Sequence, residues 1–400
     1  MARYAHIVGW GMAVPDRVLT NHELARMVDT NDEWIVSRTG IRERRIAAEH
    51  DTTAALATHA ARQALDVANV SPSEIDLIIV ATATPDYVAF PSTASLVQDA
   101  LGCANAGAFD LAAACTGFIY ALNVGSQAIR AGDAENVLVI GAEVLSRFIN
   151  WQDRSTCILF GDGAGAFLLR ASEHPGGILS AVTRSDGSGS ELLMVPAGGC
   201  RLPPSYETLR DNLHSIQMNG REVFRFATRV IVSACKDAAH KAGISMDDID
   251  IIVPHQANTR IIETAARMLN IPTERFFLNL DRYGNTSAAS IPIATCEAIA
   301  AGRIGPNSKV MFVGFGGGLT WGATVVHWQV APPPPLSRWE RLQRTALYRT
   351  ARVRSAIRRG SRLLEGLIWG RLSDDGHEPP RTRPPETRPQ PEEDDIKERR

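Results

Sequence analysis

The sequence predicts an α/β protein built from two duplicated halves, and three observations support this prediction. Residues 61–84 and 235–258 read alike, because each gives an Ala-rich helix, a short turn, an Ile-Asp pair and an apolar run. ENVLVIGAE (135–143) and SKVMFVGFG (308–316) then repeat a second apolar run in each half. These runs are continuous rather than alternating, which is typical of strands buried on both faces. We therefore expect parallel-rich sheets covered by helices on both sides.

The order of the repeat fixes which residues are equivalent in the two halves. Asp76 matches Asp250, and Ala81 matches His255. His255 is therefore an addition to the repeat rather than part of its scaffold. The alternative is that two unrelated α/β domains resemble each other by chance.

A matched spacing links two further residues. A helix closes on Ala-Gly in each half, at 131–132 and at 301–302, and counting sixteen residues back from each alanine reaches Cys115 and Asn285. We therefore expect these two residues at helix starts that face each other, with His255 close to both.

Composition excludes several classes of protein. The chain is 44% apolar and 22% charged, which is typical of a soluble globular protein. Its beginning, MARYAHIVGWG, lacks a signal-peptide pattern, and no run of eighteen apolar residues occurs, so we expect a cytoplasmic protein. The six cysteines are scattered without CxxC or Cys/His clusters, so neither a disulfide framework nor a metal site is expected.

Charge and proline content divide the chain into three parts. We expect an N-terminal half over 1–175, a C-terminal half over 176–330 and an extension over 331–400. The extension carries 16 Lys and Arg against 11 Asp and Glu, whereas the first 330 residues carry 26 against 33. It begins with APPPPL, a stiff spacer, and it ends in a Pro/Glu/Asp/Arg-rich stretch that we expect to be disordered.

The middle of the extension, 336–372, is arginine-rich with apolar residues near one helical stripe. They are Trp339, Leu342, Ala346, Val353, Ile357, Leu364 and Ile368. A basic amphipathic helix can lie on an anionic membrane surface. It can equally dock on an acidic carrier protein or on the chain's own acidic core, or it can be a loosely attached segment without a specific role.

Cys115 stands between a strand-like run, FDLAAA, and a helix-like run, TGFIYALNVGSQAIRA. A helix start offers free N–H groups and the positive end of a dipole, which favour a thiolate and can hold an oxyanion. A lone cysteine in an Ala-rich context is more often structural, so its partners decide its role. His255 ends a buried strand, where α/β proteins place their chemistry, and Asn285 alone would be an ordinary helix cap.

Two glycine-rich segments could pass for nucleotide loops, GDGAGA (161–166) and GFGGGLTWG (314–322). Both lack the GxGxxG spacing, which disfavours a nicotinamide-dependent reductase. The second segment is better interpreted as a source of an oxyanion N–H donor, with a tight turn as the alternative.

These residues carry a family resemblance. From about residue 4 to 330 the chain resembles the β-ketoacyl-acyl-carrier-protein synthase III family, which initiates bacterial type II fatty-acid synthesis. Six ordered motifs support the resemblance: VDTNDEWIVSRTGIRERRIA (28–47), FDLAAACTGF (109–118), FGDGAGA (160–166), VPHQANTRII (253–262), DRYGNTSAAS (281–290) and FGGGLTWG (315–322). The resemblance implies the five-layered αβαβα thiolase-like fold made of two duplicated halves.

The resemblance also implies a mechanism. Cys115 would accept an acyl primer from acyl-CoA as a thioester. His255 and Asn285 would then stabilise the enolate left when malonyl-carrier protein loses CO2, and this enolate would attack the acyl-cysteine. The backbone N–H groups of Cys115 and Gly317 would hold the oxyanion. No cofactor is implied, because acyl-CoA and malonyl-carrier protein are substrates.

Binding residues follow from the same resemblance. Trp34 and Arg38 would flank the adenine of CoA, Arg154 would assist there, and Asn258 would line the pantetheine channel. The alternative is that Trp34 is core packing and Arg38 a surface ion pair.

Two more positions concern protein partners. Arg260 would receive the acidic acyl-carrier protein, although a solvated surface role fits it nearly as well. Phe90 would reach across a homodimer interface to bound the acyl pocket. No nucleic acid partner is expected.

Three other functions share features with this sequence. An acyl-CoA condensing enzyme of secondary, polyketide-like metabolism shares the same residues and differs in its primer. A hydroxymethylglutaryl-CoA-forming synthase would use a glutamate base, and no such motif is visible. A non-catalytic partner subunit of a condensing enzyme usually loses the nucleophile, whereas Cys115, His255 and Asn285 are all present. The acyl group itself cannot be read from the sequence, since neighbouring primers differ by single methylenes.

Overall fold

The structure is a computed structural model of the whole chain. It describes residues 2–330 continuously and, beyond them, residues 334, 337–340, 342–346, 348, 350, 353, 357–358, 360–362 and 364. By contacts the chain forms two units, Met1–Arg352 and Val353–Arg400. The expected disorder after residue 372 falls outside the described residues.

Two central sheets carry the fold of the first unit. The first has the order β1-β7-β6-β4-β5 and the second the order β11-β12-β13-β8. Their strands are β1 (Tyr4–Ala13), β4 (Leu77–Ala81), β5 (Gly107–Leu111), β6 (Asn136–Glu143), β7 (Gly163–Ser172), β8 (Gly177–Ser185), β11 (Ile251–Pro254), β12 (Lys309–Gly316) and β13 (Thr320–His327). Starting from one edge, the first sheet runs β1, β7, β6, β4 and the second runs β8, β13, β12, β11. These matching orders confirm the duplication.

The expectation of parallel-rich sheets is wrong for about half of the strand pairs. Strand β4 runs parallel to β5 and β6, and β11 runs parallel to β12. The pairs β6–β7, β1–β7, β12–β13 and β13–β8 are antiparallel. Apolar runs did not reveal this, because a strand covered on both faces has the same composition in either direction.

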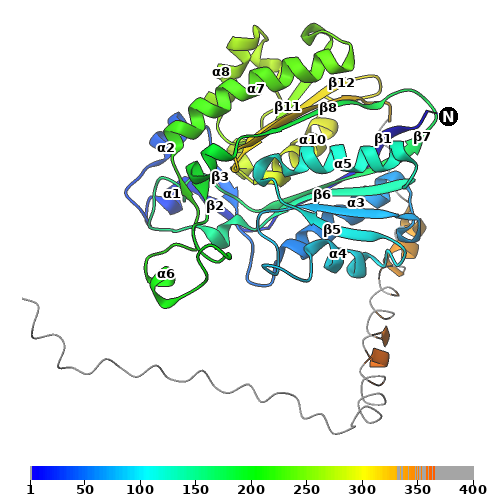
Figure 1. Cartoon of the computed structure of the whole chain (residues 1–400), viewed down its shortest axis with the longest axis horizontal. Helices are drawn as coiled ribbons and strands as arrows, with labels where there is room; N and C mark the ends of the chain where they lie inside the picture. The colour runs from blue at the N-terminus through cyan, green and yellow to red at the C-terminus, as the bar shows by residue number, and fades with distance from the viewer. Residues whose placement is uncertain are drawn as a thin grey trace, which may run out of the picture. The chain divides into compact units, whose positions relative to one another are not determined.

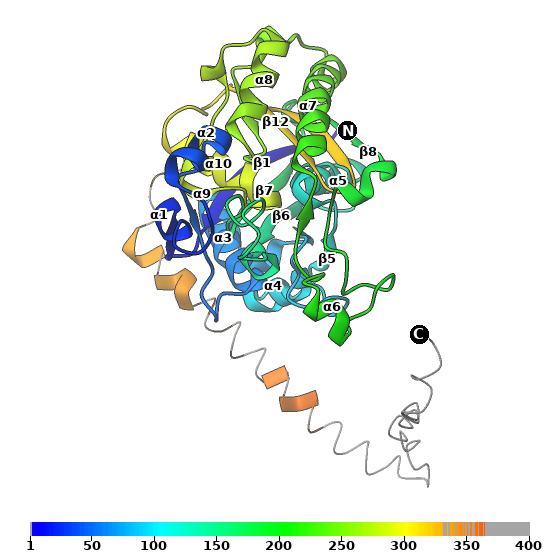
Figure 2. The same cartoon turned by 90° about the vertical axis from the view of Figure 1, so that its left-hand side faces the viewer.

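Helices form three layers around the two sheets, as Figures 1 and 2 show. Helices α3 (Thr53–Ala68) and α4 (Thr93–Leu101) cover the outer face of the first sheet. Helices α5 (Gly117–Ala131) and α10 (Ser290–Ala300) lie between the sheets. Helices α7 (Gly220–Ala242) and α8 (Thr259–Leu269) cover the outer face of the second sheet. This is the predicted αβαβα arrangement.

The remaining elements are short. They are β2 (Val18–Thr20), β3 (Glu43–Arg45), β9 (Leu193–Met194), β10 (Gln217–Met218), α1 (Asn21–Leu24), α2 (Asp32–Thr39), α6 (Tyr206–Arg210) and α9 (Leu280–Tyr283), with the 3₁₀ helices η1 (Pro72–Glu74), η2 (Ala114–Thr116), η3 (Leu145–Phe148), η4 (Gly187–Leu192), η5 (Met246–Asp248), η6 (Thr273–Arg275) and η7 (Ser287–Ala289).

The apolar strands are buried on both faces, as the sequence predicted. In β6, Val137 and Val139 face the middle layer, whereas Leu138 and Ile140 face α3 and α4. Across the middle layer Phe167 of β7 contacts Phe312 of β12 with ring centroids 5.8 Å apart. An aromatic pair of this kind contributes about 0.5–1.5 kcal/mol beyond its buried area. The middle layer therefore joins the two halves into one core.

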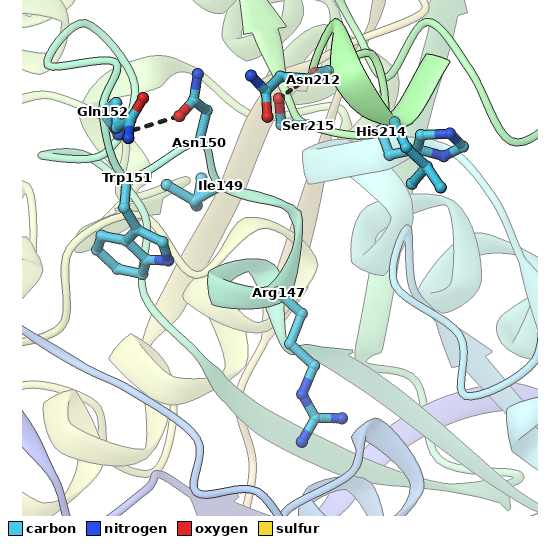
Figure 3. Close-up of a pocket in the computed structure, with 9 residues that line it drawn as sticks. Arg147, Ile149, Asn150, Trp151, Gln152, Asn212, His214 and Ser215 are labelled. Atoms are coloured by element: carbon cyan, nitrogen blue, oxygen red, sulfur yellow. Dashed lines mark hydrogen bonds between the residues drawn. The ribbon is translucent and has the colours of Figure 1, made fainter. Parts of the chain in front are cut away.

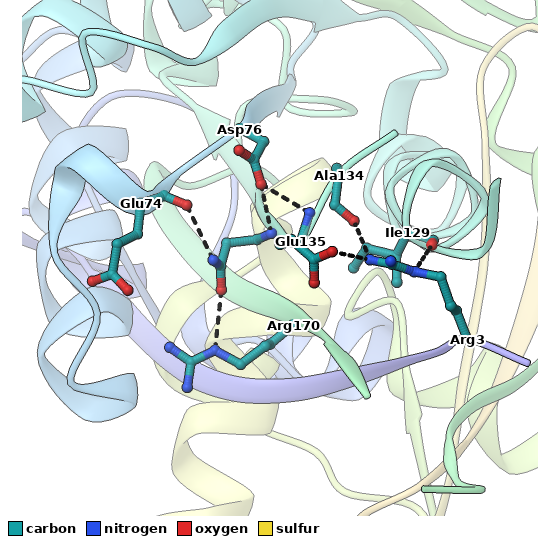
Figure 4. Close-up of polar contacts among 8 residues, drawn as sticks. Arg3, Glu74, Asp76, Ile129, Ala134, Glu135 and Arg170 are labelled. Carbon is teal, nitrogen blue, oxygen red and sulfur yellow. Dashed lines mark hydrogen bonds and ion pairs between the residues drawn. The ribbon is translucent and has the colours of Figure 1, made fainter. Parts of the chain in front are cut away.

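The repeated aspartates accept backbone N–H groups at equivalent places in the two halves. Asp76, just before β4, accepts the backbone N–H groups of Glu135 and Asn136 at 2.8 and 3.0 Å, at the start of β6. Asp250, just before β11, accepts the N–H of Lys309 at 2.7 Å, at the start of β12. Figure 4 shows Asp76 beside Glu135. The predicted equivalence of the two aspartates is confirmed.

The first part of the extension docks on the N-terminal half. Arg344 donates to the carbonyl of Leu65 at 3.0 Å, to the Asp66 carboxylate at 2.7 Å and to the Asn69 amide oxygen at 2.6 Å. These partners lie at the C-terminal end of α3, where unpaired carbonyls favour a cation. Among the alternatives weighed for the extension, this contact is to the chain's own acidic surface.

The predicted apolar stripe of the extension does not make this contact. Tyr348 packs against the hydrophobic cluster that includes α3, with the Arg62 guanidinium 4.7 Å from its ring centroid. Trp339 and Leu342, which belong to the stripe, remain 76% and 55% exposed. The docked face is therefore set by Arg344 and Tyr348, one helical turn apart, rather than by the stripe. No helix among the described residues is long and apolar enough to cross a membrane.

Candidate active site

Cys115, His255 and Asn285 line one pocket of about 290 Å³. Trp34 and Arg38 line its outer part. A larger hollow of about 510 Å³ lies elsewhere, between the loop after η3 and the loop after α6. Figure 3 shows that polar and surface groups line it, including Arg147, Asn150, Asn212 and His214, and none of the predicted residues. The smaller pocket is the candidate active site, because it contains a nucleophile with polar partners.

Cys115 lies in η2, between strand β5 and helix α5. The backbone turns sharply just before it, because Ala114 adopts a left-handed conformation with φ of 45°. The opposite wall is Gly316, where a Cβ atom would lie only 2.8 Å from the Cys115 nitrogen and 3.0 Å from its Cβ. The site therefore requires glycine at position 316 to seat the nucleophile.

The Cys115 side chain is a thiol at rest. Burial raises the pKa of Cys115 to about 12, hydrogen bonding with the Ser287 side chain partly offsets this, and the nearby Glu143 carboxylate adds to it. The sequence-based argument that a helix start favours a thiolate is thus outweighed by desolvation in the structure. The nucleophile needs a group that accepts its proton.

His255 follows β11 and is almost completely buried. Its Nδ1 lies 2.7 Å from the Ser290 hydroxyl, and the edge of its ring faces Phe315, with centroids 5.3 Å apart. Burial lowers the pKa of His255 to about 3, so the imidazole is neutral at physiological pH. A neutral imidazole carries one N–H, and the Ser290 hydroxyl determines which nitrogen holds it.

Asn285 is oriented by its own turn. Its Oδ1 accepts the backbone N–H of Ser287 at 2.8 Å. Its backbone N–H donates to the carbonyl of Leu159 at 2.8 Å, and its carbonyl accepts the N–H of Gly161 at 3.0 Å. Because Oδ1 is occupied, the NH2 group is the part of this amide that remains to serve a ligand in the pocket.

The predicted equivalence of Cys115 and Asn285 is off by three residues. The turns η2 and η7 are equivalent, since each begins with a left-handed residue, Ala114 and Ser287, with φ of 45° and 48°. Cys115 then corresponds to Ala288. Counting back from the helix ends failed because α5 has 15 residues and α10 only 11. The two turns nevertheless contact each other, so Cys115 and Asn285 share the pocket.

An aromatic and cationic cluster lies at the pocket entrance. The guanidinium carbons of Arg38 and Arg154 lie 5.6 and 5.7 Å from the ring centroid of Trp34. Arg154 also pairs with Asp29 at 3.2 Å. Asn258 lines the pocket, donates to the carbonyl of Arg38 at 3.0 Å and caps helix α8. The four predicted CoA-binding residues are therefore neighbours.

The other predicted residues lie around this site. Gly317 lines a recess beside Cys115. Arg260 is exposed on α8, with its guanidinium carbon 5.8 Å from the centroid of Phe224, which lines the pocket. Phe90 is 86% exposed and lies outside the pocket.

Sequence reasoning missed three residues that contact the predicted ones. Ser287 and Ser290 stand in the DRYGNTSAAS motif, where only Asn285 had been given a role. Glu143 ends strand β6 and binds Ser287 at 2.9 Å. The serines could have been noticed from their place in the motif, but the glutamate could not, since 144 residues separate it from Ser287.

The residues that the structure describes offer no candidate metal site. They contain no group of three or more His, Cys, Asp or Glu side chains that could hold a metal ion. The absence of a cofactor stays a prediction from the sequence.

Family models match two segments of the chain. Residues 109–187 match "3-Oxoacyl-[acyl-carrier-protein (ACP)] synthase III", and residues 239–328 match the C-terminal model of the same enzyme. The first contains Cys115 and the second contains His255 and Asn285.

Relatives that match over nearly their whole length belong to the same family as these models. The chain is 51% identical to β-ketoacyl-[acyl-carrier-protein] synthase III of Roseiflexus sp. (strain RS-1) over 328 residues, 82% of this chain and 99% of the relative. It is 54% identical to the same enzyme of Symbiobacterium thermophilum over 322 residues, 80% of this chain and 97% of the relative.

Solved structures extend the match to the fold. The 3-oxoacyl-[acyl-carrier-protein] synthase III of Aquifex aeolicus VF5 matches with a TM-score of 0.76 and 48% identity, covering 81% of this chain and all of that one. The priming β-ketosynthase from the R1128 polyketide pathway matches with a TM-score of 0.76 and 35% identity, covering 83% and 98%. The chain has the thiolase fold, it belongs to the β-ketoacyl-[acyl-carrier-protein] synthase III family, and it is an acyltransferase of fatty-acid biosynthesis.

Proposed function

We propose that this enzyme condenses an acyl-CoA primer with malonyl-acyl-carrier protein through an acyl-Cys115 thioester, and so initiates type II fatty-acid synthesis. The convergence of Cys115, His255 and Asn285 in one pocket carries the proposal. Passing the acyl group through a thioester divides a difficult transfer into two easier steps. The backbone N–H groups of Cys115 and Gly317 hold the oxyanion in the first step.

His255 and Asn285 act in the second step. Both donate hydrogen bonds to the malonyl thioester carbonyl, where negative charge develops as CO2 leaves. For His255 to donate from Nε2, its Nδ1 must be the acceptor. This requires the Ser290 hydroxyl, 2.7 Å away, to turn its proton from the Ser287 carbonyl at 2.8 Å to Nδ1. Asn285 donates from the NH2 group that its turn leaves unused.

The pocket entrance holds CoA. The adenine stacks on Trp34, which Arg38 and Arg154 already flank, and Asn258 contacts the pantetheine arm. Arg260, exposed near the entrance, receives the acidic carrier protein.

A recess of about 130 Å³ beside Cys115 takes the acyl group. Its lining is mainly apolar and includes Leu145, Phe160 and Ile216, which favours a short hydrocarbon primer. The segment with Phe90 supports a homodimer that bounds this recess, because Tyr87, Val88 and Phe90 are 55%, 86% and 86% exposed. A cytoplasmic location is part of the proposal.

Mass spectrometry of the intact protein tests the loading step. Incubation with mixed acyl-CoAs should add one acyl group, and the mass of the adduct identifies the primer. Cys115→Ala should prevent the adduct, and Cys200→Ser, which removes the exposed cysteine, should leave it unchanged. An adduct that survives Cys115→Ala would contradict the proposal.

A second candidate function is priming of a polyketide pathway. The 35% identity to a priming β-ketosynthase over 83% of this chain favours it. Consumption of malonyl-carrier protein from fatty-acid synthesis, compared with that from a polyketide pathway, separates the two functions. Release of CO2 in either assay excludes a non-catalytic partner subunit.

We also propose that segment 336–372 contacts an anionic lipid surface. The exposure of Trp339 and Leu342 in an arginine-rich segment supports this contact. The full chain should pellet with anionic vesicles at low salt, and a chain ending at residue 330 should not. Equal pelleting of both would exclude it.

A further inference from the structure

Glu143 is a fully buried carboxylate beside the nucleophile, and the chemistry proposed above does not use it. It ends strand β6, and its exposed fraction is 0%. Its oxygens lie 3.2 Å from the Thr82 hydroxyl, 3.0 Å from the Ala83 nitrogen, 2.6 Å from the Thr84 hydroxyl and 2.9 Å from the Ser287 hydroxyl. No ion pair among the described residues includes it.

The surrounding hydrogen bonds favour the ionised form of this carboxyl group. The Thr82 hydroxyl accepts the N–H of Thr84 at 3.0 Å, and the Thr84 hydroxyl accepts the N–H of Val144 at 2.9 Å. Each hydroxyl therefore turns its proton toward Glu143, and the Ala83 N–H can only donate. Four donors around one carboxyl group favour the ionised form, while burial raises the pKa of Glu143. Hydrogen bonding and burial thus act in opposite directions on the pKa of Glu143, so this carboxyl group can take up a proton and return it.

Ser287 connects this carboxyl group to the nucleophile. Its hydroxyl donates to Glu143 at 2.9 Å, and its side chain lines the same recess as Cys115, within reach of the thiol. Its position is fixed from two sides, because its N–H donates to Asn285 and its carbonyl accepts the Ser290 hydroxyl at 2.8 Å. Its φ of 48° is unusual for a residue other than glycine, and such strain persists where surrounding contacts enforce it. A continuous path thus runs from Cys115 through Ser287 to Glu143.

We propose that Glu143 accepts the Cys115 proton through Ser287 when the acyl group is loaded. The thiol proton passes to the Ser287 oxygen as the Ser287 proton passes to Glu143. The sulfur then forms a bond to the acyl carbon, and the bond from that carbon to the CoA sulfur breaks. His255 is a weaker candidate for this proton, because burial lowers its pKa to about 3. The inference rests on the proposed acyl-Cys115 thioester.

Each catalytic cycle uses Glu143 as a temporary store for one proton. Glu143 stays protonated while the acyl-enzyme exists, and the departing CoA thiolate takes a proton from solvent. When the enolate attacks the acyl-cysteine, the Cys115 thiolate is released and recovers its proton from Glu143 through Ser287. One proton therefore enters from solvent in the loading step, and none is exchanged when the product leaves Cys115.

Stopped-flow loading with a pH indicator in weak buffer measures this proton. The experiment is run near pH 7, below the ordinary thiol pKa of about 8.5, so that released CoA is protonated. The wild type should take up about one proton per acyl-enzyme counted by mass. Without storage on the protein, the Cys115 proton would offset the one taken by CoA, and no net uptake would occur.

Two variants test whether Glu143 is the group that stores the Cys115 proton. Glu143→Gln should abolish the uptake and slow loading by on the order of 10²-fold, as expected for loss of acid–base assistance. Ser287→Ala keeps the carboxylate but breaks the path, so it should also abolish the uptake. Asp162→Asn is the matched control, since Asp162 is another buried carboxylate and its side chain accepts hydrogen bonds from Ser146 and Ala47 instead of Ser287.

Decarboxylation of malonyl-carrier protein separates this role from a structural one. That reaction uses His255 and Asn285 and needs no thiol proton, so Glu143→Gln should retain it while loading is slowed. Equal loss of both reactions, unchanged loading, or wild-type loading without proton uptake would overturn the inference. A wild type that loads no acyl group at all would instead overturn the proposed function.

Discussion

The two halves of the molecule share a scaffold and differ at the ends of their equivalent strands. Strands β6 and β12 both have eight residues, and each begins at the residue whose N–H binds the repeated aspartate. The last residues are therefore equivalent, and they are Glu143 in one half and Gly316 in the other.

Each of these strand ends completes the turn of the opposite half. Gly316 leaves room for Cys115, and Glu143 holds Ser287. The two turns are thus similar, and they differ in the strand ends that complete them. Loading belongs mainly to the first turn, and decarboxylation belongs to the second turn with His255.

The largest expected effect comes from removing the space at Gly316. In Gly316→Ala the new Cβ would lie 2.8 Å from the Cys115 nitrogen, so the nucleophile must move. Misplacement by about 1 Å costs about 100-fold in rate, and we expect loading to fall at least that far. Gly305→Ala, where a Cβ has no neighbour within 4 Å, is the control. Normal loading in Gly316→Ala would show that the strand end has no such role.

Asn285→Ala should break the other half of the site. Loss of one donor at the developing enolate should lower decarboxylation and condensation by about 10²–10³-fold. The rate of loading by acyl-CoA should fall much less, since Asn285 acts after the thioester forms and touches the loading path only by accepting the Ser287 N–H. Parallel loss of both steps would mean that the two turns do not divide the reaction.

Ser290→Ala tests how His255 is oriented. Removing the hydroxyl 2.7 Å from Nδ1 should cost about one hydrogen bond, which corresponds to about tenfold in decarboxylation rate. Because burial lowers the pKa of His255 to about 3, the wild-type rate should show no titration near pH 6.5. A loss of rate with a midpoint near pH 6.5 that disappears in His255→Ala would contradict the neutral imidazole.

The smallest effects concern the repeated aspartates. Asp76 accepts two backbone N–H groups and Asp250 accepts one. Asp250→Ala should lower the free energy of unfolding by about 1 kcal/mol, and Asp76→Ala by about twice as much. Urea denaturation monitored by circular dichroism measures both. The reverse order would show that the two halves do not use their aspartates in the same way.

Much of this arrangement was predictable from the sequence. The duplicated runs predicted the two sheets and the pairing of Asp76 with Asp250, and the ordered motifs placed Cys115, His255 and Asn285 together. These features depend on local pattern or on spacing along the chain, which a single sequence displays.

The remaining features depend on contacts between distant segments. The three-residue offset follows from the different lengths of α5 and α10, which spacing alone could not reveal. The raised pKa of Cys115 comes from burial, and the role of Glu143 comes from Ser287, 144 residues away. The docking of Arg344 on α3 likewise joins segments 278 residues apart, so the apolar stripe was a poor guide to the docked face.

One measurement tests the central claim that the two halves divide the reaction through Cys115. Intact-mass spectra are recorded after loading with acyl-CoA and again after adding malonyl-carrier protein. The wild type should gain the acyl mass and then lose it, Cys115→Ala should never gain it, and Asn285→Ala should gain it and keep it. Loading without Cys115, or rapid discharge of the acyl group without Asn285, would contradict the account.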